Sequence, residues 1–156
     1  DGSLDYEEDV LESFDFVIAS LHSGFNQPLK EMTARVLRAI ANPYTTMLGH
    51  VTTRLLLRRD GVALDMEKVL SAAATEGVVV EVNANPRRLD LDWRHWQYAK
   101  SKGVKCVINS DAHRNEHASF LKLGTGVARK GWLTKGDVMN TLPLAKLRKE
   151  LAKKKN

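Results

Sequence analysis

The sequence predicts an α/β protein with a mostly parallel sheet built from about four strand–helix units. Short apolar runs alternate with longer amphipathic stretches along the chain, which is typical of βα units. Two of the helical stretches end at a glycine, Gly77 and Gly103, directly before the next apolar run. The run at 78–84, VVVEVNA, is continuous and rich in β-branched residues, which suits a strand covered on both faces.

Four apolar runs are predicted to form the strands of this sheet. They cover residues 14–20, 45–50, 78–84 and 104–109. Each is short and bounded by polar or turn-forming residues, as buried parallel strands are. A sheet of this kind places the carboxyl ends of its strands along one edge.

The first helix is predicted over residues 26–42, because its apolar residues recur at helical spacing. Asn26 is the expected N-cap, and Pro28 falls in the first turn, where its missing N–H costs nothing. The Asn42-Pro43 pair ends the helix, because a proline disfavours helical backbone at the residue before it.

The second helix is expected to begin at the N-cap Asp65 and to stop at the glycine before the third strand. A third helix is predicted over 91–103. The stretch that follows residue 113 is interpreted as an irregular loop, then a short helix from Thr134 and a final helix from Pro143.

The composition indicates one domain, residues 1–156, with 43% hydrophobic and 28% charged residues. No apolar run approaches the roughly 20 residues that a membrane helix needs. The single cysteine, Cys106, excludes an internal disulfide and fits a reducing cytoplasm, and its apolar setting favours a core side chain over a reactive thiol. Closed β/α barrels of this kind usually need about 250 residues, so the chain is either an open sheet or part of a barrel.

The net charge of +5 raises the expectation of a phosphate-bearing partner. Much of the charge lies in the final segment, KLRKELAKKKN, where six Lys and Arg side chains face one Glu. Such a run can be a nucleic-acid-binding arm. A solvated helix end, whose lysines complement the helix dipole, explains it equally simply and is favoured for the tail alone.

Polar residues follow the predicted strands at the edge where parallel sheets place their chemistry. His22 follows the first strand, His50 ends the second, and Asp111 and His113 follow the fourth. Imidazole and carboxylate are common ligands of Zn²⁺, Mn²⁺ and Fe²⁺. A bound metal would generate hydroxide near neutral pH and polarise a phosphoryl oxygen, so the pattern indicates a metal-dependent hydrolase. Each histidine alone is more often an ordinary polar residue, and the prediction rests on their joint placement.

Two residues of the third strand, Glu81 and Asn83, are interpreted as supporting groups for this site. Glu81 is expected to orient a ligand imidazole from behind, or else to be a buried carboxylate paired with the backbone or an arginine. Asn83 is expected to bond the backbone at the strand end, since Asn-Pro sequences favour turns.

Three basic residues are candidates for phosphate contact, because arginine forks match phosphate oxygens and lysine adds a positive charge. Arg54 follows His50 closely and is the candidate for a catalytic contact with a substrate phosphate. Arg129 and Lys130, before Gly131, are candidates for nucleic-acid binding. Ordinary solvated surface is the alternative for all three.

Six segments together resemble a known family. They read VIASLHSGF, NPYTTMLGH, TTRLLLRRDG, VEVNANPRRLDLDW, INSDAH and VARKGWLTKGDVMNT. In order and spacing they resemble the C-terminal polymerase-and-histidinol-phosphatase (PHP) domain of bacterial family-X DNA polymerases, over nearly the whole chain.

The resemblance implies a distorted (β/α)7 barrel with a multinuclear Mn²⁺ or Zn²⁺ site, and iron also suits its ligands. It implies a phosphoesterase that acts as a 3′–5′ exonuclease on DNA during repair. It assigns metal ligation to His22, His50, Asp111 and His113, and suggests a phosphate contact for Arg54.

Two departures from the family pattern bear on these expectations. After the second strand the family usually reads Gly-His-Pro-Thr-Gly-Arg, whereas this chain reads Gly49-His50-Val51-Thr52-Thr53-Arg54, which alters the turn that presents the arginine. The family's upstream His-x-His pair and further ligands are absent from this sequence. The chain is therefore expected to be an incomplete barrel of about four βα units, the C-terminal portion of the domain.

Three functions follow as alternatives. The first is metal-dependent hydrolysis of DNA phosphodiesters. The second is an inactive partial barrel that binds DNA or has a structural role and self-associates through its exposed sheet edge. The third is a phosphatase for small phosphate esters, of the histidinol-phosphatase type.

Overall fold

Four parallel strands form one sheet in the computed structural model, which describes residues 1–152. The strands lie side by side in the order in which they occur along the chain. They are β1 (Val17–Ala19), β2 (Thr45–Leu48), β3 (Val79–Asn83) and β4 (Cys106–Asn109). Each lies within a run predicted from the sequence, and the parallel α/β architecture is confirmed, as expected for an incomplete PHP-type barrel.

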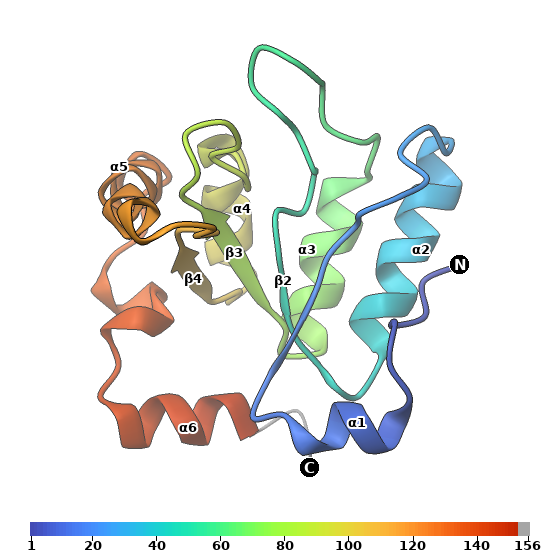
Figure 1. Cartoon of the computed structure of the whole chain (residues 1–156), viewed down its shortest axis with the longest axis horizontal. Helices are drawn as coiled ribbons and strands as arrows, with labels where there is room; N and C mark the ends of the chain where they lie inside the picture. Colours follow the sequence, from blue (N-terminus) through green and yellow to red (C-terminus); the bar gives the residue numbers. More distant parts are fainter. Residues whose placement is uncertain (153–156) are drawn as a thin grey trace.

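Helices on one face of the sheet connect successive strands. They are α2 (Leu29–Ala41), α3 (Met66–Thr75) and α4 (Trp96–Ser101), the last preceded by the single turn η1 (Trp93–His95). Figure 1 shows α4, α3 and α2 side by side from left to right, and α3 contacts both of its neighbours. This arrangement brings the four carboxyl strand ends to the upper edge of the sheet.

Local signals place most helix ends as predicted. The Asp65 carboxylate accepts a hydrogen bond from the Lys68 N–H and caps α3, as expected. Gly77 and Gly103 adopt φ values of +66° and +81°, which glycine reaches without a Cβ clash and which end the helices before β3 and β4. The prediction of Asn26 as the cap of α2 is wrong, because that helix begins after Pro28 and has no side-chain cap.

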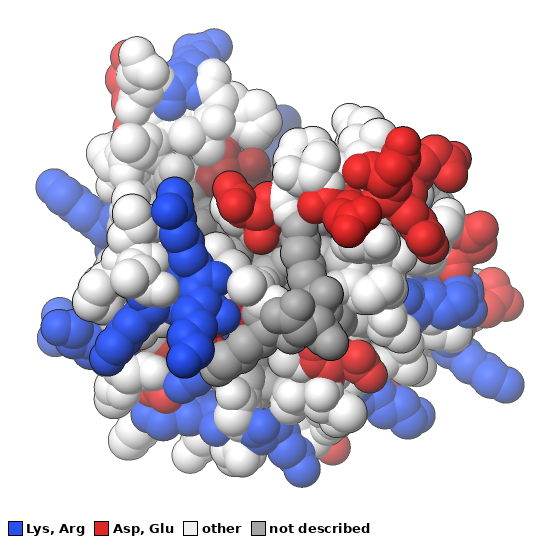
Figure 2. All heavy atoms as spheres, turned by 90° about the horizontal axis from the view of Figure 1, so that it is seen from below, with Lys and Arg blue, Asp and Glu red and all other residues white. Residues whose placement is uncertain are grey.

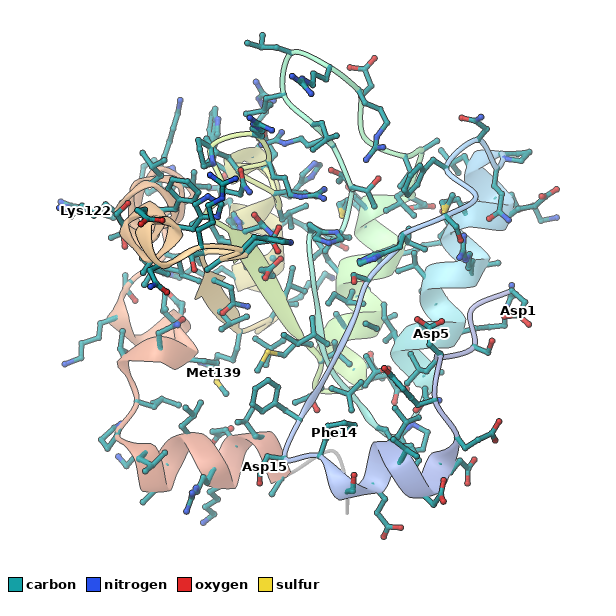
Figure 3. All side chains as sticks on the ribbon, viewed as in Figure 1. Asp1, Asp5, Phe14, Asp15, Lys122 and Met139 are labelled. Carbon is teal, nitrogen blue, oxygen red and sulfur yellow. The ribbon has the colours of Figure 1, made fainter. Side chains whose placement is uncertain are left out.

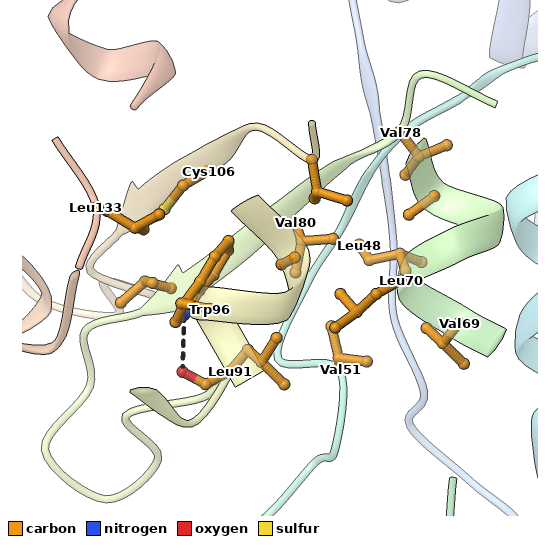
Figure 4. Close-up of a cluster of buried hydrophobic side chains, with 14 of the residues drawn as sticks. Leu48, Val51, Val69, Leu70, Val78, Val80, Leu91, Trp96, Cys106 and Leu133 are labelled. Atoms are coloured by element: carbon orange, nitrogen blue, oxygen red, sulfur yellow. Dashed lines mark hydrogen bonds between the residues drawn. The ribbon is translucent and has the colours of Figure 1, made fainter. Parts of the chain in front are cut away.

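The main core lies between the sheet and its row of helices (Figure 4). Trp96 is fully buried there among Val80, Cys106 and Leu133, and its indole N–H donates to the Leu91 carbonyl at 3.4 Å. Such burial of an aromatic ring is the largest type of apolar contribution to folding. Burial also raises the pKa of the Cys106 thiol, in keeping with its predicted place in the core.

The opposite face of the sheet is covered only in its lower half. There α6 (Leu144–Ala152) packs Leu151 and Leu147 toward Met47, Val79 and Val107. Met139, from the turn η4 (Met139–Thr141), lies between this helix and the sheet (Figure 3). The upper half of the same face stays open beside the carboxyl strand ends.

The segment after residue 113 contains a helix that was not predicted from the sequence. Residues after 113, expected to be irregular, form the turn η2 (Asn115–Phe120) and the helix α5 (Leu121–Lys130). Two glycines, Gly124 and Gly126, lower the intrinsic helix propensity of this segment. Tertiary packing overrides it, because Gly124 lies against β3 and β4 so closely that an added Cβ would be 2.5 Å from Ile108 and 2.7 Å from Ala84. The predicted short helix from Thr134 is present as η3 (Lys135–Asp137), which begins with a capping box.

The two outer strands differ in how their edges are covered. At β4, the Asn140 amide donates to the Ile108 carbonyl at 2.9 Å and accepts from the Ile108 N–H at 2.7 Å, so that a side chain imitates a neighbouring strand. The outer edge of β1 meets no further strand within residues 1–152. Phe16 and Ile18 remain 43% and 42% exposed there. Self-association through this edge stays a prediction.

Charge is segregated on the underside, at the amino ends of the strands. Figure 2 shows basic side chains over α6, which carries Lys146, Arg148 and Lys149, and acidic ones over the short helix α1 (Glu8–Ser13). The last lysines of the basic tail lie outside the described residues. Within residues 1–152, no helix is long and apolar enough to span a membrane.

The close approach of α5 to the sheet predicts opposite effects for its two glycines. Gly124→Ala should destabilise the chain by about 1–3 kcal/mol, because the new methyl group overlaps Ile108 and Ala84. Gly126→Ala, with nothing within 4 Å of its added Cβ, should stabilise by about 0.5–1 kcal/mol through helix propensity. Urea unfolding measures both, and a shift of both midpoints in the same direction would contradict the packing argument.

Candidate active site at the carboxyl edge of the sheet

The buried carboxylate of Glu81 is the centre of the candidate site. Its Oε2 accepts the His50 backbone N–H at 2.6 Å and the Asn83 amide at 3.2 Å, and its Oε1 accepts the Asn109 amide at 2.9 Å. Burial raises the pKa of Glu81, and these three hydrogen bonds oppose the shift by favouring the charged form. One side chain thus ties together the ends of β2, β3 and β4.

Two interpretations of Glu81 were open, a group that orients a ligand imidazole or a buried carboxylate bonded to the backbone or an arginine. The structure shows the second, because Glu81 accepts the His50 backbone N–H. His50 has a φ of +26°, a positive value that residues other than glycine seldom adopt. The hydrogen bond from Glu81 helps to hold that conformation. Asn83 behaves as predicted, since its amide oxygen accepts the Asn85 N–H at 3.1 Å in the turn after β3.

His22 and His50 lie together at the ends of β1 and β2. Their rings are stacked, with centroids 5.3 Å apart, and Nε2 of His22 is 2.9 Å from the Ser20 hydroxyl oxygen. Burial, and then the positive charge of Arg88, lower the pKa of His50 to about 4, so its imidazole is neutral at pH 7. Its Nδ1 is buried and has no hydrogen-bond partner among the described residues.

Asp111 and His113 lie together after β4. His113 Nδ1 donates to the Asp111 carbonyl oxygen at 2.8 Å, and Asp111 has a φ of +51°. His117 lies beside them, and its Nδ1 accepts the His113 N–H at 3.1 Å. His113 is largely exposed, with 73% of its side chain accessible.

An open hollow connects the two pairs. Its polar lining includes side chains from the ends of all four strands, and its apolar lining includes the exposed Phe16 and Ile18 and the buried Met47. The polar lining residues are Ser20, His22, His50, Glu81, Asn83, Asn109, Asp111 and Asn140. The strand-end residues predicted from the sequence therefore meet in one place, except His113, which lies at its rim beside Asp111.

The fit of these side chains to a divalent metal is partial. Imidazole and carboxylate are suitable donors, and the buried Nδ1 of His50 is a nitrogen without any other partner. Within residues 1–152, however, no three His, Cys, Asp or Glu side chains are grouped closely enough to hold a metal ion. The four predicted ligands thus supply donors in two pairs and do not form a complete metal site by themselves.

Arg54 has a different place from the one predicted. Its Nε donates to the Arg88 carbonyl at 2.8 Å, its Nη1 to the Asp92 carboxylate at 2.6 Å, and its Nη2 to the Leu89 carbonyl. All three nitrogens are engaged with the loop after β3, and the ion pair with Asp92 lowers the pKa of that carboxyl against the opposing effect of burial. In this arrangement Arg54 joins two loops, and each of its three guanidinium nitrogens already has a partner, so none is free to bind a phosphate.

A second tie between the same loops comes from Asp90, which the sequence analysis did not single out. Its fully buried Oδ2 accepts the Thr52 N–H at 2.9 Å, while its Oδ1 has no partner among the described residues. Burial raises the pKa of Asp90 to about 6, against the opposing hydrogen bonds of the loop. The LDLD sequence could not reveal this role, because alternating carboxylates also suit an exposed turn.

Arg129 and Lys130 lie at the end of α5, outside the residues that line the hollow. Both are exposed, and the Lys130 ammonium is 4.5 Å from the centre of the Trp93 ring in η1. Lys122, near the start of the same helix, projects outward (Figure 3). Binding of nucleic acid by Arg129 and Lys130 therefore stays a prediction for an outer surface rather than for the hollow.

Comparison with known proteins gives two kinds of relative. The DNA polymerase/3'-5' exonuclease PolX of Bacillus subtilis is 42% identical over 144 residues, which are 92% of this chain and 25% of that protein. A probable phosphatase of Thermoanaerobacter sp. (strain X514) is 30% identical over 164 residues, 99% of this chain and 64% of its own length. A probable phosphatase of Caldanaerobacter subterraneus is 32% identical over 122 residues. No family model matches the chain.

The coverage limits what these relatives establish. The chain spans a quarter of the PolX relative and less than two thirds of the phosphatases. The likeness to PolX extends over nearly all of the chain, so it includes every strand-end residue of the site and both loops that Arg54 joins.

The engagement of Arg54 predicts a structural cost for its removal. Arg54→Met should lower the free energy of unfolding by about 2–4 kcal/mol, because two carbonyls and a partly buried carboxylate lose their donor. Arg58→Met, at an exposed position of the same loop, is the matched control and should change it by less than about 0.5 kcal/mol. Equal unfolding midpoints for the two variants would show that Arg54 does not join the loops.

The raised pKa of Asp90 predicts a pH-dependent difference between the wild type and Asp90→Asn. The unfolded chain loses this proton near pH 4 and the folded chain near pH 6, so the Asp90 carboxyl stabilises the fold less as pH rises through that interval. Asparagine keeps an acceptor for Thr52 and does not titrate. From pH 4 to pH 7 the variant should gain on the order of 2 kcal/mol relative to the wild type. Urea unfolding at a series of pH values measures this, and parallel profiles would contradict it.

Proposed function

This chain belongs to the PHP domains of bacterial family-X DNA polymerases and corresponds to part of one, and from that premise we propose that it carries part of a phosphoesterase site. The proposed reaction is hydrolysis of the terminal 3′ phosphodiester of DNA, in the context of repair. The observation that carries the proposal is the meeting of His22, His50, Glu81 and Asp111 in one open hollow of a chain that is 42% identical to a polymerase and 3′–5′ exonuclease.

His22, His50, Asp111 and His113 are the residues proposed to contribute ligands to a Mn²⁺ or Zn²⁺ site. When bound, such an ion supplies hydroxide near neutral pH and neutralises charge on the phosphate. Since the described residues offer these donors in two pairs, further ligands are needed for a complete site.

The chain's own groups prepare the hollow in two ways. Burial keeps the His50 imidazole neutral, so one of its ring nitrogens has a lone pair available at physiological pH. Glu81 accepts hydrogen bonds from the His50 backbone and from the amides of Asn83 and Asn109, which fixes the strand ends. None of these bonds uses the side chain of a proposed metal ligand. These contacts position donors before any substrate arrives, which lowers the cost of binding.

A nuclease assay with this chain as part of a full-length family-X polymerase, which can supply the further ligands, tests the proposal. With Mn²⁺ and an oligonucleotide labelled at its 3′ end, we expect release of mononucleotides. Asp111→Ala should reduce the rate by about 100-fold or more, since even changes outside the ligand sphere of metal sites cost about 10–100-fold. Asp60→Ala, at an exposed acidic position of the loop after β2, is the control and should keep the rate.

Other outcomes of that assay have definite meanings. Full activity of Asp111→Ala would show that the hydrolytic centre lies elsewhere. Salt-sensitive retention of DNA without hydrolysis would favour the binding module, in which Arg129 and Lys130 hold phosphates, and their replacement by alanine should then weaken binding.

A phosphatase for small esters is the second candidate, and one observation favours it. The chain corresponds to 64% of the length of the Thermoanaerobacter phosphatase but to 25% of the length of PolX. Release of inorganic phosphate from a panel of small esters, with DNA left intact, would select this function.

A further inference from the structure

Two arginines lie beside the candidate site, and they differ in what their guanidinium groups do. Arg54 donates from all three of its nitrogens to groups of its own chain. Arg88 has a single ion pair, with its Nε 3.5 Å from Oδ2 of Asp111. The Nη1 of Arg88 is buried and has no hydrogen-bond partner among the described residues. A buried donor without an acceptor is costly, so its retention calls for an explanation.

The position of Arg88 relates it to both pairs of site residues. Its guanidinium contacts the carboxylate of Asp111 on the β4 side, and its positive charge is felt by His50 on the β2 side. The Arg88 side chain is 20% exposed, so one part of it remains open to an incoming group while another part is enclosed. Arg88 is not itself among the residues that line the hollow, and its contact with Asp111, which does line it, connects the two.

The backbone at Arg88 is held on both sides. Its N–H donates to the Asn85 carbonyl at 2.8 Å within the turn after β3, and its carbonyl accepts from Arg54 Nε at 2.8 Å. The neighbouring Leu89 carbonyl accepts from the same guanidinium. Because the main chain is fixed before binding, ordering Arg88 around a ligand costs little conformational entropy.

We propose that Arg88 binds the non-bridging oxygens of the substrate's phosphate group, and that Arg54 contributes only by holding the Arg88 loop in place. A guanidinium presents parallel N–H donors that match two oxygens of one phosphate, and a partly enclosed position strengthens such a bond. The 20% of the side chain that stays exposed is the part available for this contact, since Nη1 is enclosed. The inference deepens the phosphoesterase function proposed above and rests on it for the identity of the anion. The competing explanation is that Arg88 only neutralises Asp111.

Binding of inorganic phosphate, measured calorimetrically at low salt with no divalent metal added, tests Arg88 without requiring hydrolysis. Arg88→Gln should weaken phosphate binding by about 10- to 100-fold, the range expected for loss of hydrogen bonds to a charged group. Arg88→Lys keeps the charge without the fork and should recover only part of the affinity. Arg87→Gln removes the same charge at the adjacent exposed residue and should leave the affinity unchanged.

Each other result would overturn the proposal. Wild-type affinity in a folded Arg88→Gln variant, or full recovery by lysine, would show that Arg88 serves only as a counter-ion for Asp111. An equal loss in Arg87→Gln would show that general surface charge attracts the anion, and absence of phosphate binding by the wild-type chain would remove the site altogether. Since the readout is binding, a chain that binds phosphate through Arg88 and hydrolyses nothing would uphold this inference while contradicting the proposed hydrolysis.

Discussion

The buried carboxylate of Glu81 is the interaction on which the edge of the sheet depends. A carboxylate taken out of water is stable only if charged or polar donors replace its hydration. Here the His50 N–H and the amides of Asn83 and Asn109 supply these donors from three adjacent strand ends. The register of β2, β3 and β4 therefore brings three donors to one point. The same hydrogen bonds fix the positions at which these strands end and the loops that carry the site begin. An apolar residue in place of Glu81 would leave these donors unpaired inside the protein.

Above this edge, a second layer of charge joins the loops after β2 and β3. Arg54 and Asp90 reach across in opposite directions, each bonding the backbone of the other's loop. These ties stabilise backbone that is strained at His50 and Thr53, whose φ values are +26° and +56°. Strain of about 1–3 kcal/mol per residue persists only where surrounding contacts determine the conformation, and it is concentrated here beside the candidate site. The two arginines thus differ in their contacts. Arg54 donates hydrogen bonds from all three of its nitrogens within the fold, whereas Nη1 of Arg88 has no partner among the described residues.

The sequence predicts the sheet and the meeting of the strand-end residues, because both follow from local pattern and from the geometry of parallel strands. It does not predict which loop folds onto which. For that reason Arg54 was placed in the site by its nearness to His50 in the chain, whereas Arg88, far from His50 in sequence, is near enough for its charge to help lower the pKa of His50. Helix α5 was missed because Gly124 and Gly126 lower its helix propensity. One of them, Gly124, is also the residue that permits the close contact of this helix with the sheet.

Within residues 1–152, the proposed metal ligands do not form a complete site, and the sheet is open on the same side. The hollow that collects His22, His50 and Asp111 is continuous with the exposed apolar surface of Phe16 and Ile18. On the other side of the sheet, the core around Trp96 fills the space between the sheet and its helices. A group that completed the site from the open side would also cover Phe16 and Ile18. Burial of that surface would supply part of the free energy for binding the metal, because the same docking event would do both.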